Sequence, residues 1–271
     1  MTLPRSYLFV PGDRPERFTK ALSSGADVVV LDLEDAVAPA GKSAARDAVA
    51  DFLATTAAPE RLVVRINDES TPWFNDDLAL LRAHAARAVM LPKAERAASI
   101  DRISAACPGC RLLPLIESAR GVLTAESIAT ASGVQRLVFG TIDYALDMGL
   151  QGALADTVGL DAAAARLALA SRAAGIAAPV AGVTVAIDDE SQLRADLTRA
   201  LAHGFAAKLC IHPKQIAAVH ALLAPTADEL SWAERVLAAA DAAAGAAVQL
   251  DGRMIDKPVI ERARRIVQRA H

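Results

Sequence analysis

Charged side chains follow several short apolar runs of this sequence, at the points where strands would end: Asp32, Glu34, Arg65, Lys93, Glu117 and Asp143. Carboxylates that converge repel one another, and a divalent cation relieves that repulsion. Oxygen ligands, without cysteines or paired histidines at metal spacing, favour a hard ion, Mg²⁺ or alternatively Mn²⁺, over zinc. Because Mg²⁺ takes only one or two protein carboxylates, the pattern predicts a metal site formed by Glu117 and Asp143.

Helix capping competes with metal binding as the role of these two acids. An aspartate often accepts hydrogen bonds from the first N–H groups of a helix, and Asp143 directly precedes a helical segment expected near Tyr144–Leu150. Position in the sequence alone leaves both roles open for Glu117 and Asp143.

Arg65 and Lys93 are the basic residues of the set. Arg65 lies in the mainly apolar stretch Val63–Asn67, and a buried guanidinium needs an anionic partner. That partner is either a neighbouring acid, Asp32 or Glu34, or a substrate oxyanion, and both interpretations stay open. Lys93 could form a Schiff base with a carbonyl substrate, but acidic neighbours would keep its amine charged. The Schiff base is therefore the weaker hypothesis.

The elements that would position these residues alternate along the chain. Eight apolar runs are strand candidates: Tyr7–Val10, Val28–Leu31, Leu62–Ile66, Val89–Leu91, Leu112–Ile116, Leu137–Phe139, Val180–Val185 and Ala206–Ile211. They are near-continuous rather than alternating, as in strands covered on both faces. Amphipathic stretches between them predict helices, for example Pro15–Ser24, Lys42–Ala54, Ser191–His203 and Pro213–Leu223.

This order predicts a (β/α)₈ barrel over residues 1–223, with its chemistry at the C-terminal ends of the strands. A doubly wound sheet is the alternative, but no GxGxxG motif follows a strand candidate. Residues 224–271 would form a C-terminal extension with a helix over Asp228–Ala244, a short strand near Val248–Leu250, and a helix from Pro258. Eight units already complete the barrel, so we expect this extension to pack outside it or on another subunit.

Composition excludes several classes of protein. The formal net charge is −3 and no basic stripe is present, which argues against nucleic-acid binding. No run is long enough to span a membrane and no signal-peptide core is visible, so we expect a cytoplasmic protein. Three cysteines argue against a disulfide scaffold. Cys107 and Cys110 have CxxC spacing; a redox pair is one interpretation, and free thiols in a solvent-side loop are the one we expect.

Taken together, the motifs resemble a known family. They are Arg5–Gly12, Val30–Val37, Val64–Asn67, Leu91–Lys93, Ile116–Ser118, Phe139–Gly140, Asp143–Tyr144, Ile211–Pro213 and Met254–Asp256. In this order, over essentially the whole chain, they are similar to the citrate lyase beta-subunit-like proteins of the HpcH/HpaI aldolase/citrate lyase family, within the phosphoenolpyruvate/pyruvate barrel superfamily.

The resemblance implies roles for individual residues. It implies that Glu117 and Asp143 bind Mg²⁺ and that Arg65 contacts the substrate. From their positions at strand ends, Glu34 and Lys93 are further candidates for substrate contacts and Asp32 is a catalytic candidate, although some of these acids could instead hold Arg65 or Lys93 in place. The resemblance also implies that Asp256 acts in an active site shared with a neighbouring subunit, in a homotrimer or hexamer whose C-terminal segments swap. Three bases are candidates for the coenzyme phosphates: Arg5, Lys20 and Arg46.

The activity that the resemblance implies is Mg²⁺-dependent carbon–carbon cleavage of a 3-hydroxyacyl coenzyme A thioester, such as malyl-, citramalyl-, citryl- or 3-hydroxy-3-methylglutaryl-CoA, to acetyl-CoA and an oxo acid. A thioesterase step after condensation would make the protein a malate synthase instead. Two alternatives remain: an aldolase for free 4-hydroxy-2-oxo acids, and a carrier-binding beta subunit of a lyase complex. The intact segment Met254–Pro258 favours a stand-alone enzyme that uses coenzyme A.

Overall fold

The computed structural model describes residues 3–84, 86–152, 158–242 and 248–270. The chain divides into two compact units, one spanning Pro4–Val219 and the other formed mainly by the segment from His220 onward. Each unit is described by itself below. No helix among the described residues is long and apolar enough to cross a membrane.

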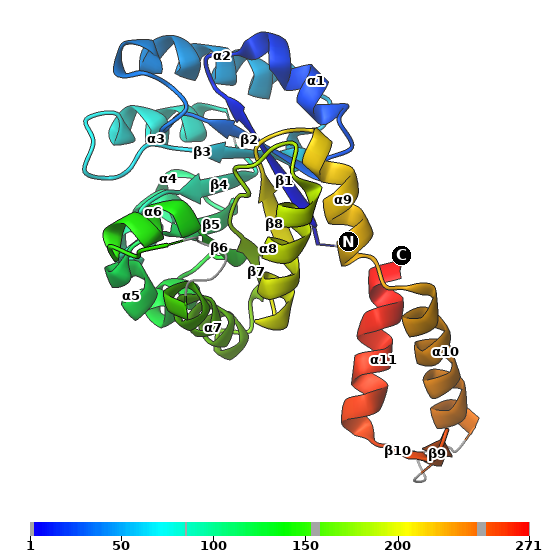
Figure 1. Cartoon of the computed structure of the whole chain (residues 1–271). Helices are drawn as coiled ribbons and strands as arrows, with labels where there is room; N and C mark the ends of the chain where they lie inside the picture. The colour runs from blue at the N-terminus through cyan, green and yellow to red at the C-terminus, as the bar shows by residue number, and fades with distance from the viewer. Residues whose placement is uncertain (1–2, 85, 153–157, 243–247, 271) are drawn as a thin grey trace. The chain divides into compact units, whose positions relative to one another are not determined.

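The larger unit is a closed barrel of eight parallel strands that pair in sequence order, with β8 returning to β1 (Figure 1). The strands are β1 (Ser6–Pro11), β2 (Val28–Asp32), β3 (Leu62–Arg65), β4 (Ala88–Leu91), β5 (Arg111–Ile116), β6 (Arg136–Phe139), β7 (Ala177–Ala181) and β8 (Ala207–Cys210). The predicted barrel is confirmed, and the doubly wound alternative is wrong.

Helices cover the outside of this barrel and explain why the strands are apolar on both faces. They are α1 (Phe18–Leu22), α2 (Lys42–Thr55), α3 (Phe74–Ala83), α4 (Ala97–Ala106), α5 (Ala119–Ala129), α6 (Thr141–Asp147), α7 (Val158–Ala173), α8 (Glu190–Ala202) and α9 (Lys214–Leu223), with short 3₁₀ turns at Pro15–Arg17, Pro39–Gly41 and Pro59–Arg61. Inside the barrel, a core cluster takes side chains from every strand, including Tyr7, Val30, Met90 and Leu209.

The seventh strand differs from its prediction. The apolar run suggested Val180–Val185, whereas β7 spans Ala177–Ala181. The chain leaves the sheet at Gly182, where an added Cβ would lie 2.8 Å from the Phe139 carbonyl oxygen. The apolar residues after Gly182 therefore belong to a loop at the C-terminal end of the barrel.

The smaller unit contains α10 (Ala227–Ala242), β9 (Val248–Leu250), β10 (Arg253–Ile255) and α11 (Lys257–Ala270). The two helices and β9 agree with the predicted extension. The antiparallel strand β10 was not predicted, because three residues directly before a helix carry too little pattern. The unit has its own small core, to which Ala233, Val236, Ile255, Ala263 and Ile266 contribute.

The cysteines of the CxxC motif are free thiols, as expected, but the predicted solvent-side loop is wrong. Cys107 and Cys110 are both buried. Cys107 ends α4, and its thiol donates a hydrogen bond of 3.1 Å to the Ala86 carbonyl. The turn therefore folds inward at the base of β4 and β5. The hydrogen bond with the Cys110 thiol lowers the pKa of Cys107 to about 7.

Candidate active site

The C-terminal ends of β2 and β3 place Asp32 beside Arg65. These two residues are paired in the parallel register of the strands. Arg65 Nε donates to Asp32 Oδ1 at 2.7 Å, and Nη2 donates to Oδ2 at 2.6 Å. Asp32 is 1% exposed and also accepts a hydrogen bond from the Glu34 backbone N–H at 2.9 Å. Asp32 therefore fixes both the guanidinium of Arg65 and the loop that carries Glu34.

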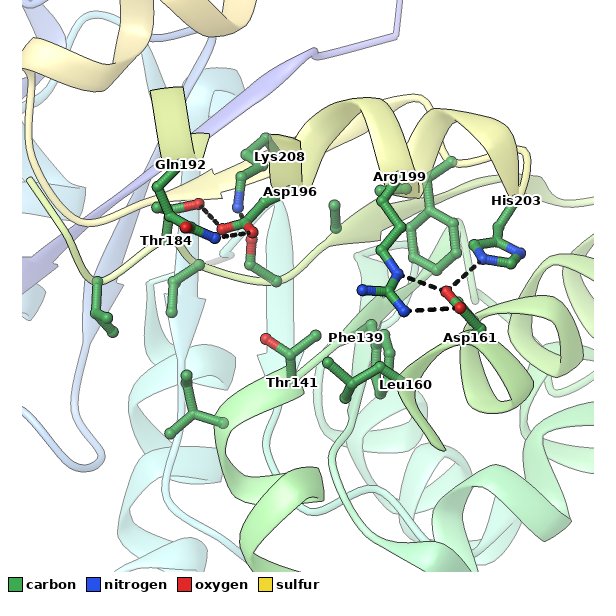
Figure 2. Close-up of a pocket in the computed structure, with 18 residues that line it drawn as sticks. Phe139, Thr141, Leu160, Asp161, Thr184, Gln192, Asp196, Arg199, His203 and Lys208 are labelled. Atoms are coloured by element: carbon green, nitrogen blue, oxygen red, sulfur yellow. Dashed lines mark hydrogen bonds and ion pairs between the residues drawn. The ribbon is translucent and has the colours of Figure 1, made fainter. Parts of the chain in front are cut away.

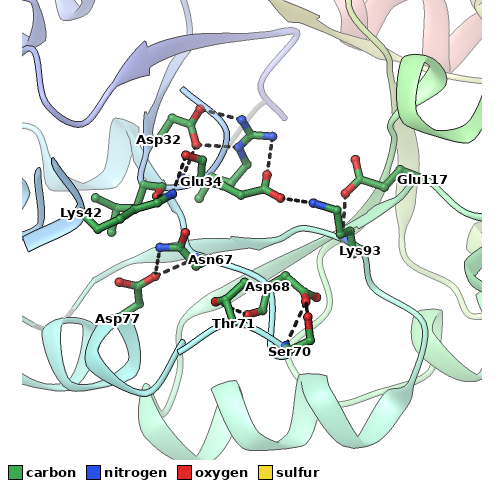
Figure 3. Close-up of polar contacts among 12 residues, drawn as sticks. Asp32, Glu34, Lys42, Asn67, Asp68, Ser70, Thr71, Asp77, Lys93 and Glu117 are labelled. Carbon is green, nitrogen blue, oxygen red and sulfur yellow. Dashed lines mark hydrogen bonds and ion pairs between the residues drawn. The ribbon is translucent and has the colours of Figure 1, made fainter. Parts of the chain in front are cut away.

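Glu34 links Arg65 to Lys93 across the end of the barrel (Figure 3). Its Oε2 lies 2.9 Å from Arg65 Nη1, and its Oε1 accepts a hydrogen bond from Lys93 Nζ at 2.6 Å. Burial raises the pKa of Glu34 even though the two cations oppose that shift. Burial alone would lower the pKa of Lys93, but the hydrogen bond to Glu34 and the negative charges of the surrounding acids together outweigh burial and raise it. A raised pKa favours the charged form of Lys93 over a nucleophilic amine, so the Schiff base stays the weaker hypothesis.

The two interpretations of Arg65 prove compatible. The salt bridges to Asp32 and Glu34 are both present. The two hydrogen bonds to Asp32 occupy two of the five N–H donors of a guanidinium, and each terminal nitrogen carries two N–H groups. The side chain of Arg65 keeps 12% of its surface exposed. Arg65, although held by Asp32 and Glu34, can therefore still donate hydrogen bonds to a ligand at the C-terminal ends of the strands, here called the barrel mouth.

Glu117 follows β5 and is 4% exposed. Its Oε1 accepts a hydrogen bond from the Lys93 backbone N–H at 2.7 Å. Gly140, after β6, lies against this carboxylate so closely that a Cβ there would come within 2.6 Å of Glu117 Oε2. Burial raises the pKa of Glu117 to about 8, and the negative charges of Glu34 and Asp143 add to that effect.

Neither acid is a helix cap, so the capping interpretation is wrong. Ser118 is the N-cap of α5, and its hydroxyl accepts a hydrogen bond from the Gly121 N–H at 3.1 Å. Helix α6 begins at Thr141, before Asp143, which lies in its first turn. The helix starts earlier than predicted because the chain turns directly at Gly140.

The site suits a hard divalent cation. Burial raises the pKa of the Glu117 carboxyl group, the charges of Glu34 and Asp143 raise it further, and a bound cation would offset both effects. Two such carboxylates suit Mg²⁺, which binds through one or two carboxylates and completes its octahedron with water and substrate. Glu117 and Asp143 are the residues that would hold it.

Without metal, the stability of the protein should depend on Glu117. The unfolded chain releases this proton near pH 4.5, whereas the folded protein holds it up to about pH 8. The folded state therefore binds more protons in this window, and the free energy of unfolding should fall by about 2–4 kcal/mol as the pH rises through it. Urea unfolding in EDTA at several pH values measures the slope. An unchanged slope in Glu117→Gln would contradict the assignment.

The other predicted residues lie elsewhere. Arg46 Nη1 lies 3.4 Å from Asp77 Oδ1, and its Nη2 lies 3.2 Å from Asp76 Oδ2, so its charge is already paired. Lys20 is exposed on α1. Arg5 directly precedes β1, at the opposite end of the barrel from the strand ends that carry Glu117. The structure does not bring these three bases together.

Asp256 belongs to the smaller unit, where it is exposed and directly precedes α11. Its Oδ1 accepts a hydrogen bond from the Val259 N–H at 3.1 Å, which is a helix-capping contact. A cap is a local role, and it leaves the carboxylate accessible to solvent.

Residues 5–213 match the family model described as HpcH/HpaI aldolase/citrate lyase. The chain belongs to this family. A second model, described as a carbon–carbon bond lyase of the TIM-barrel fold, matches residues 164–271. The HpcH/HpaI match spans the whole barrel mouth, from the Asp32–Arg65 pair to Asp143.

Individual relatives match this chain over nearly the full length. A citrate lyase subunit beta-like protein of Mycobacterium tuberculosis is 40% identical over 268 residues, covering 97% of this chain and 94% of that protein. A (3S)-malyl-CoA thioesterase of Cereibacter sphaeroides is 34% identical, covering 98% and 94%. The crystal structure of CitE from M. tuberculosis in complex with magnesium, acetoacetate and coenzyme A superposes with a TM-score of 0.85 at 38% identity, covering 98% of each chain.

Sequence reasoning missed residues that hold this HpcH/HpaI site together. Lys42 is buried, and its Nζ donates to the carbonyls of Leu33 at 2.6 Å and Glu34 at 2.7 Å. Burial lowers the pKa of Lys42 against the opposing charges of the nearby acids. A second contact joins Asn67 to Asp77. Asp77 Oδ2 accepts hydrogen bonds from the backbone N–H and the side-chain amide of Asn67, both at 2.7 Å. Neither pairing has a local sequence signal.

Proposed function

We propose that this protein is a Mg²⁺-dependent carbon–carbon lyase that reversibly cleaves a 3-hydroxyacyl-CoA thioester to acetyl-CoA and an oxo acid. The observation that carries the proposal is the buried Glu117 carboxylate, near Asp143 and close to the clamped guanidinium of Arg65. Support comes from the related CitE of M. tuberculosis, whose structure holds magnesium, acetoacetate and coenzyme A. Magnesium on Glu117 and Asp143 would hold the substrate's oxygen-rich end and lower the pKa of its hydroxyl group.

Cleavage breaks the bond between the carbinol carbon and the carbon next to the thioester. The hydroxyl loses its proton and becomes the carbonyl of the oxo acid, while the electron pair of the broken bond moves to the thioester fragment as an enolate. A proton added to the enolate carbon gives acetyl-CoA. Residues of the site must therefore accept the hydroxyl proton, stabilise an oxyanion and deliver a proton to the enolate carbon.

Arg65 is positioned to stabilise the enolate oxygen. Its guanidinium cannot rotate freely, because Asp32 holds Nε and Nη2 and Glu34 lies against Nη1. A fixed donor is not reorganised when charge develops, which makes its hydrogen bond more effective in the transition state. We propose that Asp32 and Glu34 are positioning residues, and that Lys93 keeps Glu34 in place while adding positive charge near the substrate.

We propose that Asp256 supplies the proton and that it serves the barrel of a neighbouring copy in a homotrimer or hexamer. Asp256→Asn and Arg65→Ala proteins should each lose most activity, because each lacks one essential group. Refolding the two together should restore part of the turnover, since some mixed sites contain both an intact Asp256 and an intact Arg65. Steady-state turnover against the mixing ratio measures this. If the turnover of the mixtures equals only the sum of the turnovers of the two variants, the active site is not shared between subunits.

The substrate is one of the thioesters named above, and one relative favours a second reaction to test. Because a (3S)-malyl-CoA thioesterase of C. sphaeroides is 34% identical, hydrolysis of malyl-CoA is the second candidate activity. Condensation of acetyl-CoA with an oxo acid, followed by this hydrolysis, would be a malate-synthase-type reaction. A difference of one methyl group in a substrate changes selectivity only about 10–200-fold. Candidates must therefore be compared quantitatively.

A panel of malyl-, citramalyl-, citryl- and 3-hydroxy-3-methylglutaryl-CoA, assayed with Mg²⁺ and with EDTA, tests the function. We expect cleavage of at least one ester, with release of acetyl-CoA, and loss of that activity in EDTA. Release of free coenzyme A instead would indicate thioester hydrolysis. Turnover of free 4-hydroxy-2-oxo acids alone would indicate an aldolase, and tight coenzyme A binding without any turnover would indicate a carrier-binding subunit.

A further inference from the structure

A cavity away from the candidate active site lies outside the barrel wall, between β7 and β8 on one side and helices α7 and α8 on the other (Figure 2). Its volume is about 360 Å³, within the range of small-molecule sites. Most of its lining is apolar and includes Phe139, Leu160, Ala164, Ala181, Ala200 and Phe205. None of these residues takes part in the proposed cleavage.

A buried cation lies at one end of this cavity. Lys208 lies between Ala207 and Leu209, which both point into the barrel core, so its side chain points outward, beneath α8. Lys208 is 1% exposed, and burial lowers its pKa to about 8. Its Nζ donates a hydrogen bond to the Gly182 carbonyl. No ion pair with a carboxylate is found for Lys208 within the described part of the chain.

The acid that acts on the charge of Lys208, Asp196, is engaged by other groups. Asp196 accepts a hydrogen bond from the Thr184 hydroxyl at 2.6 Å and another from Gln192 Nε2 at 2.7 Å. Asp196 therefore favours the charged form of Lys208 from a distance without contacting it. A buried ammonium that donates to a neutral carbonyl would gain from a closer anion.

The charges at the opposite end of the cavity balance one another. Arg199 donates to both oxygens of Asp161, each at 2.7 Å, and His203 Nε2 lies 2.8 Å from Asp161 Oδ1. This bidentate pair resembles a structural clamp between α7 and α8. Lys208 is therefore the charged group of the lining that is best placed to receive an anionic ligand.

We propose that this cavity binds a small monocarboxylate with an aliphatic tail. The carboxylate would pair with the Lys208 ammonium, and the tail would lie against Leu160, Ala164 and Phe205. Apolar walls around one buried charge match such an amphiphile, whereas a dicarboxylate would leave its second charge without a partner. The inference does not depend on the proposed lyase function, because it concerns a different cavity.

Binding must be measured directly rather than through turnover. Thr141 and Ile142 line the cavity, and Asp143 follows them in the same turn of α6. A ligand here would contact the turn that carries a proposed metal ligand, so a change in activity could arise at either site. Calorimetric titration of the full-length protein with octanoate, octanol and acetate distinguishes the contribution of the carboxylate charge to binding from that of the aliphatic tail.

We expect octanoate to bind, octanol to bind more weakly and acetate to show no binding. Lys208→Met keeps the approximate volume of the side chain and removes its charge. It should weaken the affinity for octanoate by about tenfold or more and leave the affinity for octanol unchanged. Equal octanoate affinity in wild type and Lys208→Met, or no binding of octanoate to wild type, would overturn the proposal.

Three variants locate the ligand. Ala164→Phe fills the cavity and should abolish binding of both probes, whereas Leu169→Phe, an exposed position on the same helix α7, should bind octanoate as wild type does. Glu117→Gln should also bind octanoate normally, which places the ligand away from the barrel mouth. Loss of octanoate binding in Glu117→Gln would overturn the proposal. Circular dichroism checks folding, and if Ala164→Phe does not fold, the Lys208→Met comparison decides.

Discussion

Glu117→Gln is expected to lower turnover of the preferred thioester by more than about a hundredfold, because loss of even an outer-shell partner of a catalytic metal typically costs about 10–100-fold. The same substitution should not weaken the fold. Glutamine keeps the size of the side chain and can still accept the hydrogen bond from the Lys93 N–H. It replaces an ionisable carboxyl group, whose charged form is opposed by burial and by Glu34 and Asp143, with a neutral amide, so the metal-free variant should be as stable as wild type or more stable by about 1–2 kcal/mol.

The combination of a more stable protein with a much slower reaction separates a metal ligand from a structural acid. Wild type should gain thermal stability when Mg²⁺ is added, since a ligand that binds the folded state stabilises it. Glu117→Gln should gain little. Glu126→Gln, the same change at an exposed position on α5, is the matched control and should retain both turnover and the response to Mg²⁺. A Glu117→Gln protein that responds fully to Mg²⁺ would contradict the assignment.

Burial on both faces explains why the barrel could be predicted from sequence. Strands covered by helices and by the barrel core must be apolar throughout, and runs such as Val28–Leu31 stand out from the helical stretches between them. The end of β7 could not be predicted in this way. The apolar run continues past Gly182, and the contact with the Phe139 carbonyl that ends the strand comes from a distant part of the chain.

The positions of charged residues at strand ends predicted the residues that gather at the barrel mouth, but not how they are connected. Lys42 opens a helix, where an exposed lysine would be ordinary, and only the fold brings its amine to the Leu33 carbonyl. Arg5 illustrates the opposite limit of sequence patterns. It belongs to a family motif, yet the direction of β1 puts it at the other end of the barrel. Motif membership does not specify which end of a strand a residue occupies.

Arg65→Met is expected to damage both stability and catalysis, and the two effects can be separated. Removing the guanidinium leaves Asp32 and Glu34 buried without their shared cation, which should cost about 3–5 kcal/mol of unfolding free energy. It also removes the proposed oxyanion donor, which should lower kcat by about 100–1000-fold. Since that contact would be made in the transition state, kcat and kcat/KM should fall together.

The double variant Asp32→Asn/Arg65→Met distinguishes a catalytic Arg65 from a purely structural one. Asparagine removes the stranded charge of Asp32, while Glu34 keeps its contact with Lys93 Nζ at 2.6 Å. Urea unfolding should therefore show that much of the lost stability returns, with a clear coupling energy between the two positions. Turnover should not return, because neither residue can replace the donor. Recovery of turnover together with stability would show that Arg65 only holds Asp32 and Glu34 in place.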